Sequence, residues 1–264
     1  IVGDIQANYF VEAMKKIKAL PVGGLNGYVA PLLAAWSSIA QGETIKNALA
    51  HLIPLEQEGS KPLYYLHKAL LLDFKGNQEA AVKAYQQGIK EQGSLILRVA
   101  QLLGNLYERK GDTDKAKALY KQFAQDNPNS SLPRQALDLL DAKTKPQPII
   151  LTAQHGAAES FFGIATSLSQ QNARGMALFF ARIGIYLRPD FPVMKILLSN
   201  LLQLDGQLEK ANTVLLSIDA SSIYSWPARL SAAESLNDLG RTDEATKILI
   251  AMAEEEPKLA APLI

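Results

Sequence analysis

The chain has 264 residues, of which 48% are hydrophobic and 20% are charged. Its 27 basic and 26 acidic residues leave a formal net charge of +1, so no excess of positive charge favours a nucleic acid as partner. The sequence contains no cysteine, which excludes disulfides, cysteine-ligated metal centres and thiol catalysis. No apolar run reaches the roughly 18 residues that a membrane-spanning helix needs, so no direct membrane span is expected.

The first predicted element is a helix over Gln6–Leu20, which Pro21 ends. No first helix precedes it, so we interpret 6–20 as half of a two-helix unit. The chain begins without Met and ends in an apolar stretch after Pro257, and we therefore expect both ends to be cut from a longer protein.

From residue 28 onwards, apolar residues recur at the three- and four-residue spacing of amphipathic helices. Gly or Asn interrupts these helices at intervals of 34, 35, 61, 34 and 34 residues. Both residue types tolerate the left-handed backbone that follows a helix, so each is predicted to lie in the turn between two antiparallel helices. The six turn residues are Gly42, Gly76, Gly111, Asn172, Gly206 and Gly240.

Small residues recur on either side of these turns. If the turn residue is position 15 of each unit, position 8 is always small: Ala35, Ala69, Gly104, Ala165, Ser199 and Ala233. Position 20 is Ala in five of six units: Asn47, Ala81, Ala116, Ala177, Ala211 and Ala245. Small side chains at both positions allow the two helices of a hairpin to cross closely.

Together with Tyr or Leu at position 24 and Pro at position 32, this pattern resembles the tetratricopeptide repeat (TPR), a helix–turn–helix unit of 34 residues. The clearest copy is 97–130, which carries Gly104, Tyr107, Gly111, Ala116, Tyr120 and Pro128. The resemblance implies an all-α fold, an α-α superhelix (TPR solenoid) of about 13–15 antiparallel helices. The stretches 25–36, 156–159 and 186–192 also resemble an exported bacterial TPR family. That likeness implies a periplasmic protein, with a cytoplasmic location as the alternative.

The 61-residue interval indicates an incomplete unit between two blocks. An extra helix is expected over 131–142, and the Pro-containing segment 143–152 is expected to be a linker because Pro cannot continue a helix. The N-terminal TPR block is then 1–142 and the C-terminal block is 153–264. The repeats are predicted at about 28–61, 62–96 and 97–130, and at about 158–191, 192–225 and 226–259. Whether the linker is a hinge, a rigid kink or a decayed repeat is left open.

No catalytic constellation is apparent in the sequence. His51, His67 and His155 show no metal-ligand spacing, and no phosphate loop, nucleophile elbow or paired-carboxylate motif occurs. We therefore predict a protein that is not an enzyme and that has no metal or cofactor. A catalytic part outside these 264 residues is the alternative.

A partner-binding groove is predicted from the first-helix positions that line the concave face of TPR proteins. Asn105 and Asn200 at position 9 could bind a peptide backbone, since an amide both donates and accepts hydrogen bonds. Arg98 and Arg109 could pair with an acidic group of the peptide. The full set of predicted groove residues is Arg98, Gln101, Asn105, Arg109, Phe162, Thr166, Asn200 and Leu204. Ordinary solvated helix residues are the alternative interpretation.

The same positions in the first two repeats form an apolar inner wall of Trp36, Leu66, Leu70 and Phe74. Such a wall is expected to be covered, either by a part of the protein itself, for example the 6–20 helix, or by a partner.

The leading hypothesis is a non-catalytic protein–protein interaction scaffold. It would bind a segment of another protein or a peptide in the concave TPR groove, and no nucleic acid. One alternative is a self-assembling structural or assembly factor, which would make the protein a homo-oligomer. Another is a carrier of an apolar ligand on the inner wall of the first two repeats.

Overall fold

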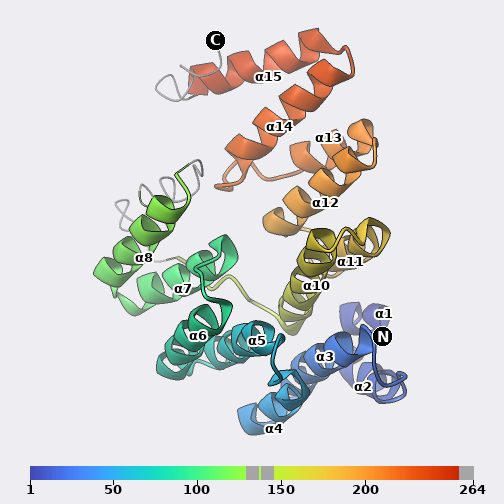
Figure 1. The fold of residues 1–264 in the computed structure, drawn as a ribbon, viewed down its shortest axis with the longest axis vertical. Helices are drawn as coiled ribbons and strands as arrows, with labels where there is room; N and C mark the ends of the chain where they lie inside the picture. Colours follow the sequence, from blue (N-terminus) through green and yellow to red (C-terminus); the bar gives the residue numbers. More distant parts are fainter. Residues whose placement is uncertain (129–136, 138–145, 256–264) are drawn as a thin grey trace. The chain divides into compact units, whose positions relative to one another are not determined.

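The computed structural model describes residues 1–128, 137 and 146–255 (Figure 1). Within these residues the chain forms fourteen α-helices and one short 3-10 helix, and no strand. The predicted all-α fold is confirmed. The chain divides into two compact units, Ile1–Ile164 and Ala165–Ile264.

The first unit begins with two short helices, α1 (Val2–Gln6) and α2 (Phe10–Lys18). The helix predicted over 6–20 is therefore shorter than expected, because Asn8 has a φ of 64° and separates α1 from α2. The buried side of α2 packs on the next helix, α3 (Asn26–Ala40).

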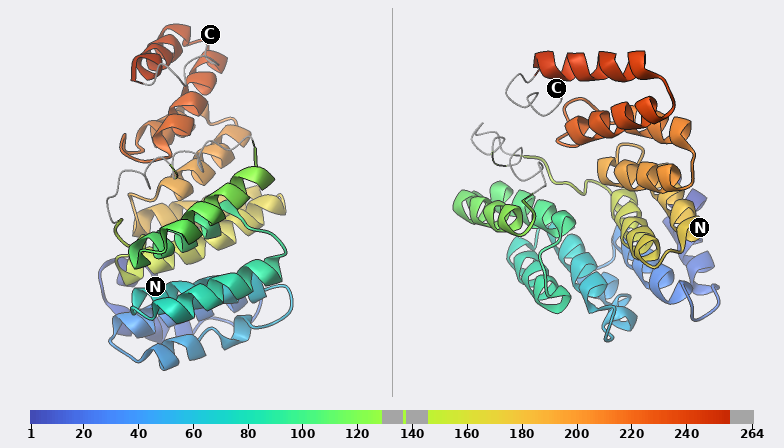
Figure 2. Two further views of the ribbon diagram at one scale, coloured as in Figure 1. Left: turned by 90° about the vertical axis from the view of Figure 1, so that its left-hand side faces the viewer. Right: turned by 45° about the horizontal axis from the view of Figure 1, so that its top comes forward.

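Three helical hairpins form the body of the first unit. They are α3 with α4 (Ile45–Ala50), α5 (Lys61–Phe74) with α6 (Gln78–Gln92), and α7 (Leu97–Lys110) with α8 (Thr113–Asp126). The 3-10 helix η1 (Ile53–Leu55) follows α4. Consecutive helices pack on each other in chain order, as the views in Figure 2 also show. The unit ends within α10 (Ala153–Gln170), whose last residues belong to the second unit.

The second unit continues the same pattern of consecutive packed helices. Its helices after α10 are α11 (Arg174–Leu187), α12 (Pro192–Leu204), α13 (Leu208–Leu216), α14 (Ser225–Asp238) and α15 (Thr242–Glu255).

All six predicted turn residues adopt the left-handed backbone. Their φ angles are 82° at Gly42, 79° at Gly76, 83° at Gly111, 59° at Asn172, 71° at Gly206 and 74° at Gly240. Gly adopts this region without steric cost, and Asn is the side chain that tolerates it best. The turn positions that define the repeats are thus confirmed.

The predicted position 20 of the first repeat is wrong by one residue. Asn47 is exposed, whereas Ala48 is fully buried and takes the place that Ala occupies in the other five units. The reason is an extra residue in the turn: α4 begins three residues after Gly42, and Thr44 caps it by accepting a hydrogen bond from the Asn47 amide at 3.2 Å. Position 20 is therefore small in all six units.

The predicted block boundary falls in the least described part of the chain. The extra helix expected over 131–142 lies outside the described residues, apart from residue 137, which is helical. Residues 146–152 contain no helix, as their prolines predicted. A boundary at 143–152 stays a prediction, and the two compact units are divided between Ile164 and Ala165.

The crossing of α7 and α8 provides a test of the repeat packing. A Cβ atom added to Gly104 would overlap the ring of Tyr120, which is buried. We expect Gly104→Ala to lower the free energy of unfolding by about 1–3 kcal/mol through overpacking, measured by urea denaturation. The control is Gly175→Ala in α11, where a Cβ would meet no atom within 4 Å. Because Ala has a higher helix propensity than Gly, this variant should be as stable as wild type or slightly more stable. Equal stability of the two variants would contradict the assigned crossing.

Candidate functional site

The apolar wall of the first unit is covered by the chain's own helix α10. Trp36 is only 1% exposed, and a Cβ at Gly156 would overlap its indole ring, so the α10 backbone lies directly against that ring. About two turns further along α10, a Cβ at Gly163 would lie 3.3 Å from Leu63 Cδ1. The part of the protein that covers this wall is therefore α10. The 6–20 helix, which was the example expected from the sequence, contributes α2, and α2 packs on α3.

Trp36 is held from its other sides by two residues of α5. Its Nε1 donates a hydrogen bond to Nδ1 of His67 at 3.2 Å, and its ring meets that of Phe74 edge-on at a centroid distance of 5.8 Å. Burial lowers the pKa of His67 to about 3, so the imidazole is neutral at physiological pH and can accept this bond. Of the other two wall residues, Leu70 is buried and Leu66 is half-buried.

Arg98 of α7 binds Glu159 of α10 through a buried, two-pronged ion pair. Its Nε donates to Glu159 Oε2 at 3.1 Å, and its Nη2 donates to Oε1. Its Nη1 donates to Oε1 of Gln101, one turn along α7, at 3.3 Å. Glu159 is 1% exposed, and a carboxylate so far removed from water is stable only because the guanidinium neutralises it and satisfies its oxygens.

Asn105 of α7 binds the main chain of the segment that precedes α10. Its Nδ2 donates to the carbonyl oxygen of Gln147 at 2.9 Å, and its Oδ1 accepts from Nε of Arg109 at 2.9 Å. Arg109 also pairs with Asp73 of α5. Burial raises the pKa of the Asp73 carboxyl, and the hydrogen bond from Arg109 opposes this shift. Both hydrogen-bonding functions of the Asn105 amide are thus used.

The hydroxyl of Tyr85, on α6, is buried close enough to these charged residues to feel their charges. The sequence did not indicate a role for this hydroxyl. Burial raises its pKa well above the usual value, and the carboxylates of Asp73 and Glu159 add to the shift. The hydroxyl is therefore neutral. Within the described structure it has no hydrogen-bond partner.

The four predicted groove residues of α7 therefore contact one another and the chain's own 146–164 segment. Glu159 fills the role predicted for an acidic group of a partner, and Gln147 fills that of a bound main chain. A signal for this was present in the sequence, since Arg98 and Glu159 occupy position 2 of consecutive complete repeats and carry opposite charges. Binding of a partner by these four residues stays a prediction.

The other four predicted groove residues lie on α10 and α12. Phe162 and Thr166 of α10 are half-buried. Asn200 and Leu204 of α12 are exposed, and the Leu204 residue is 63% exposed. At position 9 of the repeat, Asn105 thus binds the chain itself, whereas Asn200 is exposed to solvent.

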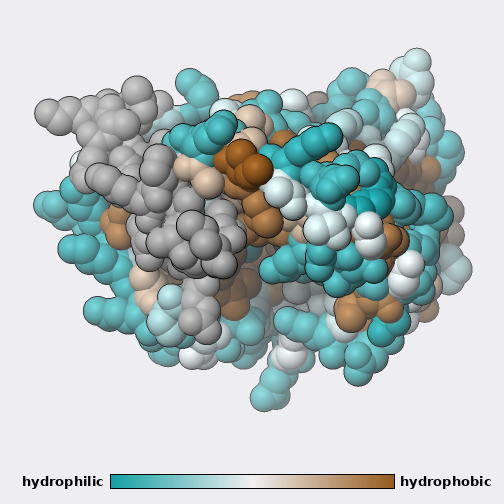
Figure 3. All heavy atoms as spheres, turned by 90° about the horizontal axis from the view of Figure 1, so that it is seen from above, coloured by the Kyte–Doolittle hydropathy of each residue, from teal (hydrophilic) through white to brown (hydrophobic). Residues whose placement is uncertain are grey.

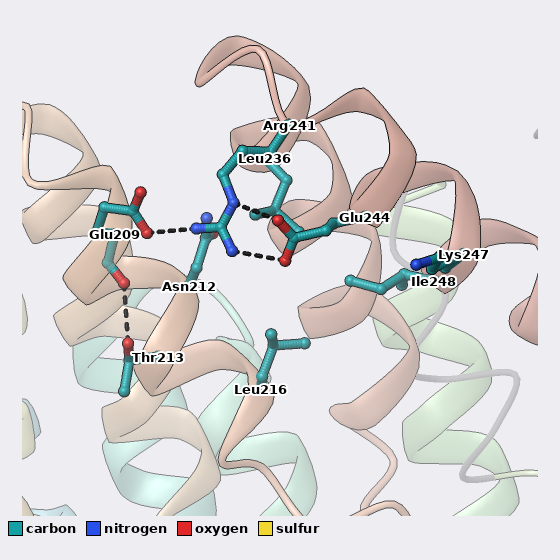
Figure 4. Close-up of a pocket in the computed structure, with 9 residues that line it drawn as sticks. All are labelled: Glu209, Asn212, Thr213, Leu216, Leu236, Arg241, Glu244, Lys247 and Ile248. Carbon is teal, nitrogen blue, oxygen red and sulfur yellow. Dashed lines mark hydrogen bonds and ion pairs between the residues drawn. The ribbon is translucent and has the colours of Figure 1, made fainter.

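An open depression of about 540 Å³ lies along α13, α14 and α15 of the second unit (Figure 4). Arg241 crosses it, donating hydrogen bonds to Glu209 of α13 at 2.7 Å and to Glu244 of α15 at 2.6 Å. The amide-bearing residue Asn212 lines the depression and is only 4% exposed. The sequence pattern did not indicate this site.

The described residues were also compared with the requirements of a metal site and of a membrane-spanning helix. On the face drawn in Figure 3, hydrophilic residues cover most of the surface and apolar residues show in small groups. Across the residues that the structure describes, no group of three His, Asp or Glu side chains is arranged to hold a metal ion. In the same residues, no helix combines the length and the apolar character needed to cross a bilayer.

Two stretches of the chain, 63–94 and 100–130, match models of the tetratricopeptide repeat. The chain contains TPRs. These stretches coincide with the hairpins α5–α6 and α7–α8. No curated protein sequence matches the chain significantly.

The chain also matches solved structures at low sequence identity. One is the crystal structure of TTC0263, a thermophilic TPR protein in Thermus thermophilus, which is 17% identical with a TM-score of 0.32. The match covers 75% of this chain and 92% of that one. Another is a chain in the structure of Naa15/Naa10 bound to HypK-THB, which is 14% identical with a TM-score of 0.39. That match covers 97% of this chain and 41% of the other.

The ion pair between α7 and α10 can be tested by unpairing it. We expect Glu159→Gln to lower the free energy of unfolding by about 3 kcal/mol or more, because the buried Arg98 guanidinium loses the carboxylate that it binds with two hydrogen bonds. Replacing both partners, as Arg98→Met with Glu159→Leu, should recover most of the loss. The control is Glu79→Gln, which breaks a pair with Lys110 whose carboxylate is 82% exposed and should cost less than about 1 kcal/mol. Similar losses in Glu159→Gln and Glu79→Gln, by urea denaturation, would contradict a buried pair.

The buried imidazole predicts a specific pH dependence. The pKa of His67 is about 3 in the folded chain against 6.5 for an exposed imidazole, so between these values only the unfolded chain binds the proton. The free energy of unfolding should therefore fall as the pH is lowered from 6.5, by up to about 1.4 kcal/mol per pH unit from this group. His67→Gln keeps an acceptor for Trp36 and should lack this slope in denaturation measured across that range. Identical slopes in both proteins would show that His67 is protonated when folded.

Proposed function

We propose that the protein is a non-catalytic scaffold that binds a segment of another protein through Asn200 and Leu204 on α12. The presence of TPR hairpins supports this general mode of action. The observation that carries the proposal is the contrast at position 9 of the repeat. Asn105 binds a main-chain carbonyl of its own chain, while Asn200 is exposed.

The contact made by Asn105 shows the chemistry that this repeat position performs. Its amide donates to the carbonyl oxygen of a non-helical stretch at Gln147, 2.9 Å away, with no need for a particular side chain. Asn200 presents the same amide to solvent at the equivalent position. We infer that it binds the main chain of a partner segment in the same way.

The surroundings of Asn200 add an apolar contact. Leu204, one turn further along α12, is 63% exposed and can pack against an apolar side chain of the segment. Between them in the sequence, Gln203 donates a hydrogen bond to Ser231 of α14 at 3.2 Å, which holds the two first helices together at this level.

The first unit is a poorer place for a partner. A segment that bound Arg98 or Asn105 would have to displace Glu159 and Gln147, and the displaced Glu159 carboxylate would lose the two hydrogen bonds that it accepts from Arg98. We therefore assign the α7 residues to holding the chain's own segment.

Two further parts of the proposal rest on sequence. The absence of a catalytic motif supports a protein without enzymatic activity, and the likeness to an exported bacterial TPR family supports a periplasmic location. The alternative of an apolar-ligand carrier used the wall at Trp36. It loses that support because α10 lies against Trp36.

The proposal predicts which variant loses a partner. Full-length protein is immobilised, and proteins retained from an extract of the source organism are quantified by mass spectrometry. The double variant Asn200→Ala with Leu204→Ala should retain at least about tenfold less of the specific partner, since it loses a hydrogen-bonding amide and an apolar contact.

The matched control is Ile250→Ala on the second helix α15, where the residue is 53% exposed and lies off the proposed strip. It should retain the partner as wild type does. A partner retained equally by wild type and the double variant would place the binding site elsewhere. Failure of the wild-type protein to enrich any protein over an unrelated bait would contradict the scaffold function itself.

A further inference from the structure

The helix α11 of the second unit exposes a row of large apolar side chains. Met176 is 43% exposed, and Phe179 and Tyr186 are each 55% exposed. Together with the half-buried Ile183 they recur at intervals of three, four and three residues, which places all four on one face of the helix. Single exposed apolar residues are ordinary on a protein surface, whereas a row of them marks a surface for interaction.

The other second helices are polar or small at the equivalent positions. Met176 and Phe179 occupy positions 19 and 22 of their repeat, counted from the turn residue at position 15. Their counterparts in α6, α8, α13 and α15 are all exposed, and none is a large apolar residue: Ala80 and Lys83, Lys115 and Ala118, Lys210 and Thr213, and Glu244 and Lys247. The packing of a repeat therefore does not require apolar side chains here, and the row belongs to this one hairpin.

The most exposed ring of the row is supported by a buried neighbour. Phe179 meets Phe180, which is buried, edge-on at a centroid distance of 5.3 Å. A side chain that is already held by such a contact loses little conformational freedom when a partner covers it. Phe179 is thus suited to be an anchor of an interface, a role that large aromatic side chains often have.

Arg182 places a positive charge beside the middle of this row. It is exposed and lies three residues after Phe179 and four before Tyr186. The helix carries two Arg and no acidic residue. The other, Arg174, donates a hydrogen bond to the carbonyl oxygen of Leu204 at 2.8 Å, whereas in the described part of the chain no carboxylate pairs with Arg182. An acidic side chain is the complement of this surface.

We propose that this face of α11 docks an amphipathic helix of a partner protein, one that bears large apolar residues at three- and four-residue spacing and an acidic residue beside them. Side chains at this spacing form ridges that fit the grooves of a second helix. The apolar residues pack on Phe179 and its neighbours, and the carboxylate pairs with Arg182.

Two other occupants fit less well. A second copy of α11 would bring further Arg residues and no acidic residue to the contact. A membrane surface would gain little from one unpaired cation, because binding to anionic lipid takes clusters of basic residues. The α11 face also differs from the proposed strip on α12 and does not depend on it.

The proposal can be tested with two synthetic peptides of about 15 residues, each held helical by a side-chain bridge because free helices of this length are marginal in water. Both carry the same row of Leu, and one has Glu beside the row where the other has Lys. Each is titrated into 15N-labelled full-length protein. We expect saturable shifts of α11 backbone signals with the Glu peptide, and at least about tenfold weaker binding of the Lys peptide.

Two variants examine the apolar and the charged part of the face separately. Phe179→Gln should weaken binding of the Glu peptide at least about tenfold, because the anchoring ring is lost. Arg182→Glu changes an exposed side chain, so its melting temperature should stay near that of wild type, and it should bind the Lys peptide more tightly than the Glu peptide. This reversal keeps the test decisive if Phe179→Gln alters folding.

The matched control is Ile250→Gln, which removes an exposed apolar side chain from another second helix, α15, and should bind the Glu peptide as wild type does. The double variant Asn200→Ala with Leu204→Ala should also bind it normally, so a failure of the α12 strip is distinct from a failure of this face.

Four results would overturn the proposal. The first is no saturable shift of α11 signals up to the solubility limit of the Glu peptide, and the second is unchanged preference in Arg182→Glu. The third is a dimer in sedimentation that Phe179→Gln dissociates, which would make a second copy the occupant. The fourth is binding to phosphatidylglycerol vesicles that Phe179→Gln abolishes, which would make a membrane the occupant.

Discussion

The first unit depends on the close packing of α10 against the first helices of the repeats. Gly156 allows the backbone of α10 to touch the Trp36 ring, and Glu159 is placed where Arg98 can bind it with two hydrogen bonds. An apolar contact and a buried ion pair thus act on the same helix, three residues apart. The ion pair depends on this packing, because the buried carboxylate needs α10 to hold it against α7.

This packing gives equivalent repeat positions different roles. Asn105 and Asn200 occupy the same place in their hairpins, but one is bound to Gln147 of its own chain and the other is exposed. A repeat array therefore presents a binding surface only where its own chain leaves the first helices uncovered. The functional proposal follows from this difference between two copies of one residue.

A buried polar group contributes to the packing of the first unit. His67 is buried and neutral, and its Nδ1 accepts a bond from the indole of Trp36, which it helps to hold. Burial keeps the imidazole neutral, and a neutral ring nitrogen can accept the bond from the indole.

The sequence alone determined the helical hairpins, their turns and the small residues at their crossings, because these depend on local backbone preference and on a spacing that repeats. All six turn residues were predicted correctly, and the one register error, at Asn47, came from an extra residue in a turn. The chemistry at Arg98 and Asn105 was also predicted, but not what they bind. Only the tertiary structure decided that, since contacts such as that between Arg98 and Glu159 join residues 61 positions apart. No local pattern specifies such a pairing, and the exposure of Asn200 likewise depends on which helices pack over it.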